Sequence, residues 1–206
     1  KNSESKILQI TGPTQGVGKS TIAKNVAVSL SSLKKKVVLI DFDYKKGKLH
    51  RQFNVEPLAN MDTFEKEFEI SKFKISEYLS FIPRKKSGAK DFMPFIESNL
   101  ANIFFQKLRN EFDYIVLDTP PILNLIDALA VSQHTDLLYF VCRHNMTTEK
   151  ELRAAAQVLD SINKKPDGVV YNAYKEEFGN YYYYSEYDYK YNYGYNYKYY
   201  EADKDG

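Results

Sequence analysis

A run of glycines followed by a lysine near the start of the chain has the form of a phosphate-binding loop. The sequence Gly-Pro-Thr-Gln-Gly-Val-Gly-Lys-Ser-Thr occupies residues 12–21, after an apolar run and before a helical pattern. Glycines let backbone N–H groups turn inward, and the N-terminus of a helix favours anionic charge. In such a loop Lys19 neutralises the β- and γ-phosphates, and the Ser20 hydroxyl binds Mg²⁺. The loop residues predicted to bind nucleotide are Gly16, Val17, Gly18, Lys19, Ser20 and Thr21.

The loop departs from the phosphate-loop consensus at its start. In the pattern G-x-x-x-x-G-K-[ST] the first glycine falls where this chain has Pro13, and Gly12 stands one place early. The apolar run before the loop and the helical pattern after it still provide the context that phosphate loops need. We therefore predict a site for ATP or ADP together with Mg²⁺.

Three aspartates follow apolar runs and are candidates for catalysis and for holding Mg²⁺. Asp41 and Asp43 end one run at a spacing of two residues, which places their side chains on the same side. Asp118 ends another run, and Pro120 and Pro121 stop that strand abruptly. Each aspartate has an alternative interpretation as a turn or capping residue. Beside a phosphate loop the catalytic interpretation gains weight, because Mg²⁺ requires oxygen ligands.

Other polar residues give weaker signals. Asn172 ends the last apolar run and is a candidate for contacting the adenine edge of the nucleotide, or else a turn residue. The single cysteine, Cys142, lies in an apolar run and should be buried. We expect the basic residues between 84 and 90 to form a solvated loop. Three histidines, at positions 50, 134 and 144, lack the spacing of metal ligands.

The C-terminal segment is unusually rich in tyrosine. Residues 181–200 contain twelve tyrosines in twenty positions, and only six occur elsewhere. The segment 187–199 alternates tyrosine with polar residues, as a strand would, but the sequence offers no further apolar strand to cover it. We therefore expect a flexible low-complexity tail, with an aggregation-prone edge strand or a packed strand as the alternative. A phosphate site and many phenols on one chain suggest donor and acceptor of a phosphoryl transfer. The candidate acceptors are Tyr181, Tyr182, Tyr183, Tyr184, Tyr187, Tyr189, Tyr191, Tyr193, Tyr195, Tyr197, Tyr199 and Tyr200.

The elements that must position these residues alternate between strands and helices. Continuous apolar strands separated by helices indicate a doubly wound, mainly parallel sheet with helices on both faces, an α/β fold of the phosphate-loop NTPase type. Residues 1–174 should form this domain, and residues 175–206 the tail. The first helix should face the core with Ile22, Val26, Val28 and Leu30. We predict strands at 6–11, 37–42, 78–83, 114–117, 137–142 and 168–171, and helices at 19–33, 96–112, 122–132 and 148–162.

Length and composition fit one such domain. The net charge of +2 divides into −2 on residues 181–206 and +4 on the remainder, which is too weak to argue for nucleic acid. No run approaches the ~18 apolar residues of a membrane span, and no signal peptide is visible. Because the chain begins a few residues before its first strand, we expect a domain of a longer protein.

Taken together, these motifs resemble those of the bacterial tyrosine kinases (BY-kinases), particularly the Wzc-like enzymes of capsule and exopolysaccharide export. Four features carry the resemblance: the phosphate loop at 16–21, the Asp41-x-Asp43 element, the Leu-Asp-Thr-Pro-Pro sequence at 117–121 and the tyrosine cluster. The fold of that family is a parallel α/β sheet related to the partition and septum-positioning ATPases.

The resemblance also implies roles for individual residues. Lys19 and Ser20 would hold phosphates and Mg²⁺, and Asp43 and Asp118 would organise the metal shell. Asp41 would be the base toward the incoming phenol. The catalytic set is then Lys19, Asp41, Asp43 and Asp118, and the metal set is Ser20, Asp43 and Asp118.

The function that the resemblance implies is an ATP-dependent protein-tyrosine autokinase, which phosphorylates its C-terminal tyrosines in trans within a ring-like homo-oligomer such as an octamer. Implied partners are a membrane-spanning co-polymerase or activator segment and a cognate phosphotyrosine phosphatase, but no nucleic acid. The implied role is regulation of capsular or exopolysaccharide polymerisation and export, from the cytoplasmic side of an inner-membrane protein.

The chain departs from this family in some respects, and other functions compete with the kinase. Lys45 replaces the usual arginine, and the expected Pro-Asn-Pro-Ser-Glu sequence is not recognisable near residues 88–96. The helix that mediates ring assembly would lie upstream of Lys1. A switch ATPase of the partition or septum type is the main alternative, although its signature lysine is replaced here by Thr14. A binding module with a cohesive tail is a third.

Overall fold

The computed structural model describes residues 5–44, 47–58, 70–84, 92–123 and 126–175 of the chain. The chain divides into two units, Lys1–Tyr174 and Lys175–Gly206, and every described helix and strand belongs to the first. The twelve candidate acceptor tyrosines lie outside the described residues, as does Lys45. The division of roles between a catalytic domain and a tail therefore stays a prediction.

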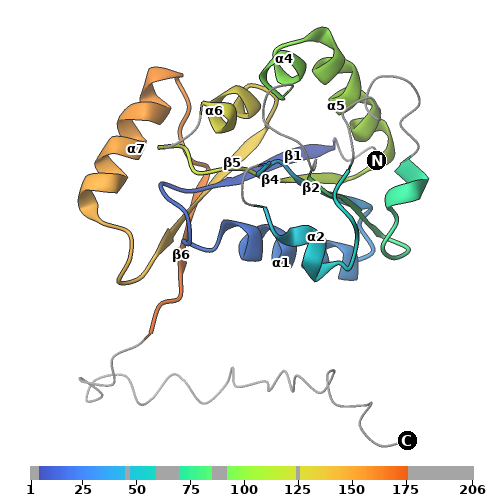
Figure 1. The fold of residues 1–206 in the computed structure, drawn as a ribbon, viewed down its shortest axis with the longest axis horizontal. Coiled ribbons are helices and arrows are strands. Elements are labelled where there is room, and N and C mark those ends of the chain that lie inside the picture. The colour runs from blue at the N-terminus through green and yellow to red at the C-terminus, as the bar shows by residue number, and fades with distance from the viewer. Residues whose placement is uncertain (1–4, 45–46, 59–69, 85–91, 124–125, 176–206) are drawn as a thin grey trace, which may run out of the picture. The chain divides into compact units, whose positions relative to one another are not determined.

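Among the described residues, six strands form one parallel sheet in the order β3-β2-β4-β1-β5-β6, which confirms the predicted α/β fold (Figure 1). Each predicted strand is present to within one residue at either end. Because the carboxyl ends of parallel strands meet at one edge of a sheet, the residues that follow β1, β2 and β4 come together there. The strands are β1 (Lys6–Thr11), β2 (Val37–Asp41), β3 (Leu79–Ile82), β4 (Tyr114–Asp118), β5 (Leu137–Arg143) and β6 (Gly168–Asn172).

One face of the sheet is covered by α1 (Lys19–Ser32), and the short α2 (Leu49–Gln52) lies on the same side (Figure 1). Ala23 and Ala27 of α1 are fully buried in the same apolar cluster as Leu39 of β2. We predicted that Val28 would also face the core, but it is 39% exposed. It lies one residue, about 100° of helix rotation, away from the face that carries Ala27.

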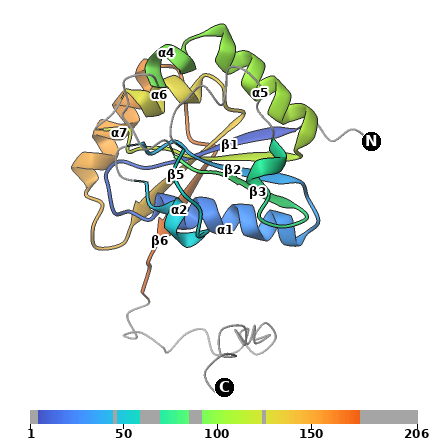
Figure 2. The ribbon, with the colours of Figure 1, turned by 45° about the vertical axis from the view of Figure 1, so that its right-hand side comes forward.

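The opposite face is covered by α4 (Phe92–Ile96), α5 (Asn99–Glu111), α6 (Asp127–Ser132) and α7 (Glu149–Ser161) (Figures 1 and 2). The helix predicted at 96–112 is present as α5 but begins only at Asn99, because Ser98 adopts an extended conformation and caps α5 by accepting a hydrogen bond from the Leu100 N–H. The separate helix α4, which ends at Ile96, was not predicted. The helix predicted at 122–132 begins only at Asp127.

The sheet is not covered evenly. Leu138 and Phe140 of β5 pack against Ala155 and Leu159 of α7, whereas the side chains of β6 alternate between half-buried and exposed positions. Among the described helices, none is long and apolar enough to cross a lipid bilayer.

Candidate functional site

The loop at residues 12–18 leaves the carboxyl end of β1 and enters α1 through positions that require glycine. Gly16 and Gly18 have φ angles of +87° and +105°, in a region that other L-residues rarely adopt. A Cβ on Gly12 would lie 2.5 Å from the Val141 carbonyl oxygen of β5. The close packing that demands a glycine therefore falls at residue 12, which explains why Pro13 can occupy the first glycine position of the consensus.

Lys19 opens α1 and is almost completely buried, with 5% of its surface exposed. Its Nζ donates a hydrogen bond of 3.3 Å to the Thr14 carbonyl oxygen, so the side chain folds back over the loop. Burial lowers the pKa of Lys19, and the carboxyl groups of Asp118 and Asp43 oppose that shift. The ammonium group therefore stands between the loop and an acidic cluster, where it can neutralise a phosphate.

Asp41 and Asp118 end neighbouring strands and lie directly opposite each other in the β2–β4 register. Their exposed fractions are only 1% and 0%. Burial raises the pKa of Asp118 to about 7, with Ser20 and Lys19 opposing the shift and Asp43 adding to it. Burial, together with Asp118 and Asp43, raises the pKa of Asp41 well above its usual range. Two buried carboxyl groups side by side disfavour double ionisation, so this pair retains a proton far above the usual pKa of a carboxylic acid.

Three of the four oxygens of these buried carboxyl groups lack a hydrogen-bond donor among the described residues. Both oxygens of Asp118 and the Oδ2 of Asp41 accept no hydrogen bond from the described residues. The Ser20 hydroxyl lies close enough to Asp118 to lower its pKa, but the two groups do not meet at a hydrogen-bonding distance and angle. Unsatisfied buried acceptors are costly, and a cation would relieve that cost.

These oxygens fit Mg²⁺, which takes oxygen ligands from one or two carboxylates and completes its shell with phosphate and water. Within the described ranges, no group of three His, Cys, Asp or Glu side chains forms a complete metal cage. Asp41 and Asp118 offer carboxyl oxygens without a donor, so phosphate and water would have to complete the shell of a cation here. Of the predicted ligands, Asp43 lies next to Asp41 through its N–H hydrogen bond, Asp118 lies opposite Asp41 in the strand register, and Ser20 follows Lys19 in the first turn of α1. Their role as metal ligands stays a prediction.

The turn after β2 folds back onto Asp41. The Asp43 N–H donates to the Asp41 Oδ1 at 3.1 Å, and the Gly47 N–H donates to the Asp43 carbonyl oxygen at 2.7 Å. A Cβ on Gly47 would lie 2.5 Å from both carboxyl oxygens of Asp41. Gly47 was not among the predicted site residues, because a single glycine in a loop does not indicate what its backbone will approach.

Arg84 is a second residue of this region that was not among the predicted site residues. It follows β3, and its Nη1 donates to the Tyr44 carbonyl oxygen at 2.8 Å. Its charge also lowers the pKa of Asp41, against the larger effect of burial. The expectation of a solvated basic loop is therefore wrong for Arg84, and residues 85–90 lie outside the described ranges. Arg84 follows a predicted strand, as the aspartates do, and this position could have indicated that it lies near the site.

Two residues from β5 and β6 hold the other side of the phosphate loop. The Asn172 Nδ2 donates to the Val17 carbonyl oxygen at 2.8 Å, and the Arg143 Nη1 donates to the Gly16 carbonyl oxygen at 2.9 Å. Asn172 also packs so tightly that a Cβ on Gly18 would lie 2.0 Å from its Nδ2. These contacts support the loop itself, and the predicted contact of Asn172 with adenine stays a prediction.

Comparisons with known proteins agree with this geometry. The model of a family described as AAA domain matches residues 5–166. Tyrosine-protein kinase ptk of Acinetobacter johnsonii is 30% identical over 184 residues, which are 87% of this chain and 25% of that protein. The chain therefore spans about a quarter of the length of this relative.

Two solved structures place the fold in a wider group. The kinase domain of the Escherichia coli tyrosine kinase ETK gives a TM-score of 0.75 at 22% identity, covering 88% of this chain and 72% of that one. The MinC:MinD cell division protein complex of Aquifex aeolicus gives a TM-score of 0.64 at 23% identity, with coverages of 83% and 70%. At such identities the likeness establishes the fold alone.

Proposed function

The chain belongs to the AAA domain family, and from this premise we propose that it is the catalytic part of an ATP-dependent protein-tyrosine autokinase. The observation that carries the proposal is the pair of buried carboxyl groups, Asp41 and Asp118, whose unsatisfied oxygens lie in one cluster with Lys19 at the edge where the phosphate loop begins. The tyrosine-rich tail supplies candidate acceptors, and the sequence similarity to a tyrosine-protein kinase supports this choice of acceptor.

In this proposal the loop binds the triphosphate of ATP through its backbone amides and Lys19. Ser20, Asp43 and Asp118 would hold Mg²⁺, which supplies neutralisation of the charge on the β- and γ-phosphates. Phosphoryl transfer passes through a loose transition state, so positioning and charge neutralisation account for most of the catalysis. Asn172 and Arg143 keep the loop in place through their hydrogen bonds to its carbonyl oxygens.

The transfer forms a bond between a phenolic oxygen and the γ-phosphorus and breaks the bond from that phosphorus to the β–γ bridging oxygen. ADP leaves with the electron pair of the broken bond, and the phenolic proton passes to Asp41. Burial raises the pKa of Asp41, and Arg84 opposes that shift. Asp41 can accept the proton only in its ionised form, which Arg84 and a bound Mg²⁺ would favour. In that form its raised pKa makes it the stronger base.

We further propose the setting of the reaction. Tyrosines of the tail would be phosphorylated in trans within a homo-oligomer, with a membrane-spanning activator segment and a phosphotyrosine phosphatase as partners. The phosphorylation state would regulate capsular or exopolysaccharide polymerisation and export from the cytoplasmic side of the inner membrane. The support for this setting is the resemblance of the motifs. The chain spans only about a quarter of the length of the relative with 30% identity.

A switch ATPase of the partition or septum type is the second candidate. It is favoured by the fold shared with the MinC:MinD complex. Thr14 occupies the loop position where those ATPases usually carry a lysine, and the C-terminal segment is tyrosine-rich rather than an apolar amphipathic helix. Both observations favour the kinase.

Intact-mass spectrometry after incubation with Mg²⁺ and ATP separates the candidates. The kinase predicts stepwise additions of phosphate that map to residues 175–206 and disappear in Lys19→Met. Lys35→Met, which replaces an exposed lysine just beyond α1, serves as the matched control and should retain them. Release of ADP without any change in mass would establish the switch ATPase and overturn the kinase. If neither ADP nor phosphorylated chain is formed, the result favours a binding module.

A further inference from the structure

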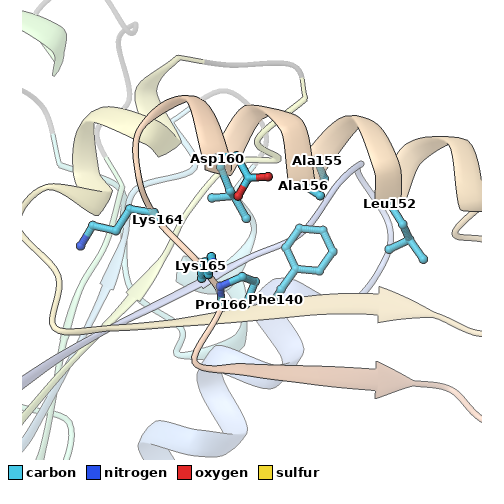
Figure 3. A pocket seen from close by; sticks show the side chains of 9 residues that line it. Phe140, Leu152, Ala155, Ala156, Asp160, Lys164, Lys165 and Pro166 are labelled. Atoms are coloured by element: carbon cyan, nitrogen blue, oxygen red, sulfur yellow. The ribbon is translucent and has the colours of Figure 1, made fainter.

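A polar cavity with a volume of about 460 Å³ lies between α2, the segment that follows α2, and the residue just after β3. Its lining includes the side chains of His50, Arg51, Asn54 and Arg84. The cavity between β5 and α7 differs from it, since it has a volume of about 170 Å³ and is lined mainly by apolar residues such as Phe140 (Figure 3). A polar cavity selects its ligand through hydrogen bonds and charge.

Two nitrogen atoms of the polar cavity are buried without a hydrogen-bond partner among the described residues. They are the Nδ1 of His50 and the Nε of Arg84. The Arg84 Nη1 donates to the Tyr44 carbonyl oxygen at 2.8 Å, and the Leu58 N–H donates to the Arg84 carbonyl oxygen at 2.9 Å. Arg84 is therefore held at both its backbone and its guanidinium group while its Nε–H has no acceptor. A buried donor without an acceptor costs free energy, which an acceptor atom of a ligand would recover.

The charge of the polar cavity favours an anion. Arg51 and Arg84 line it together with His50, and Glu56 is the acid among its described lining residues. Burial lowers the pKa of His50, the charges of Arg84 and Arg51 add to that shift, and Glu56 opposes it. A guanidinium group presents a planar fork of N–H donors that matches the paired oxygens of a carboxylate or a phosphate. The cavity therefore suits an anion with paired oxygens.

The order of the strands separates this cavity from the phosphate loop and brings it close to Asp41. The loop follows β1, and both β4 and β2 lie between β1 and β3 in the sheet. Ile82 of β3 pairs with Ile40 of β2, so Arg84 leaves the sheet beside the end of β2. Burial raises the pKa of Asp41, and the charge of Arg84 acts against that shift. Because Asp41 is the proposed base, a phenol that reaches it brings its neighbouring residues toward the cavity.

We propose that the cavity lined by His50, Arg51 and Arg84 is a subsite for a carboxylate side chain that lies one or two residues from the acceptor tyrosine of a substrate peptide. Successive residues of an extended peptide are about 3.3 Å apart, so these positions stay within about 7 Å of the tyrosine along the chain. The proposed kinase would then prefer tyrosines in acidic surroundings. The inference rests on the proposed function in one respect: the peptide that binds here is the acceptor of the phosphoryl group.

Nuclear magnetic resonance of the full chain, with ¹⁵N-labelled arginine and histidine, tests the subsite without ATP. Two peptides with blocked ends are titrated, Gly-Glu-Phe-Asp-Gly and Gly-Gln-Phe-Asn-Gly, in which phenylalanine replaces the acceptor tyrosine. We expect the acidic peptide to shift the signals of the Arg84 Nε–H and the His50 ring, with a Kd at least about tenfold lower than that of the neutral peptide. Because no ATP is present, this binding can fail while the mass-spectrometric experiment still shows phosphate additions, and the reverse.

Matched variants control the titration. Arg84→Gln should abolish the preference for the acidic peptide, and Arg51→Gln, at an exposed residue, should reduce it about threefold. Arg153→Gln makes the same change at an exposed residue of α7 and should leave both Kd values unchanged. Equal Kd values for the two peptides in the wild type, or an unchanged preference in either folded variant of the cavity, would overturn the inference. Saturation of the same signals by inorganic phosphate at a lower concentration than by the acidic peptide would overturn the assignment to a carboxylate.

Discussion

Two pairs of strands flank β1 in the sheet, β2 with β4 on one side and β5 with β6 on the other. Both pairs end at the same edge of the sheet, but their residues are exposed to water to different extents. On one side, β2 is buried along its whole length and β4 along all but its first residue, and they end in Asp41 and Asp118. On the other side, β6 is nowhere fully buried, and Arg143 at the end of β5 is exposed. Both ends contribute groups to the region of the phosphate loop.

The difference shows how one sheet edge can serve two tasks. Burial disfavours the charged form of a carboxyl group, so the pKa values of the two aspartates rise above their usual range on the buried side. On the exposed side, Asn172 and Arg143 instead donate hydrogen bonds to the backbone of the loop. The buried aspartates Asp41 and Asp118 are suited to chemistry. Asn172, which is half-buried, and Arg143, which is exposed, are suited to holding the loop.

The largest expected effect comes from removing a charge on the buried side. Asp118→Asn should lower the rate of tail phosphorylation by about 100-fold or more. In other enzymes, removal of one group that stabilises the charge of the transition state has an effect of this size. In the absence of nucleotide, the midpoint of urea unfolding should be unchanged or higher, because the amide no longer repels Asp41. Asp160→Asn, at an exposed position of α7, is the control for both measurements. Equal activity of the two variants would contradict the catalytic role.

The pH dependence of stability sharpens the same contrast. The pKa of Asp118 is raised from 3.8 to about 7, so between these values the folded state binds a proton that the unfolded chain has released. The contribution of this group to stability is therefore complete below pH 3.8 and is lost as the pH rises through about 7. Without nucleotide, the free energy of unfolding should fall more steeply in the wild type than in Asp118→Asn, by up to about 1.4 kcal/mol per pH unit. Parallel curves from urea unfolding across this range would refute the shift.

A substitution in the turn over Asp41 should have a smaller effect. Gly47→Ala introduces a Cβ only 2.5 Å from the Asp41 carboxyl oxygens, and such overpacking typically costs about 1–3 kcal/mol of unfolding free energy. On the exposed side, Val169→Ala should change stability by no more than about 0.5 kcal/mol. Urea unfolding of both variants measures the difference. If both variants lose the same free energy of unfolding, the buried and the exposed strand pairs do not differ in how tightly they are packed.

The smallest expected effect concerns the support of the loop from the exposed side. Asn172→Ala removes the hydrogen bond to the Val17 carbonyl oxygen, which is worth about 1 kcal/mol. The Kd for a fluorescent ATP analogue should rise roughly fivefold, with little change in the unfolding midpoint. Arg153→Ala breaks only an exposed ion pair with Glu149 on α7 and should leave nucleotide affinity unchanged. If Asn172→Ala lowers the equilibrium constant for folding tenfold or more, Asn172 has a structural role instead.

Much of the fold could be predicted from the sequence because the strands are short, continuous apolar runs. Helix boundaries were less certain: the extended backbone of Ser98 divides a pattern that looks continuous in its apolar positions. The candidate site was predicted in its residue types, but not in its pairing. Asp41 faces Asp118 only because β2 neighbours β4 in the sheet, and local patterns do not specify the order of strands. The contacts of Gly47 and Arg84 likewise depend on how the chain folds back over Asp41.

The hydrogen bond from Asn172 to Val17 joins the last described strand to the loop that is predicted to receive ATP. Residue 175, where the tyrosine-rich unit begins, follows three positions after Asn172. Loss of this one side-chain amide would therefore remove a hydrogen bond that holds the phosphate loop to the strand through which the chain continues toward that unit.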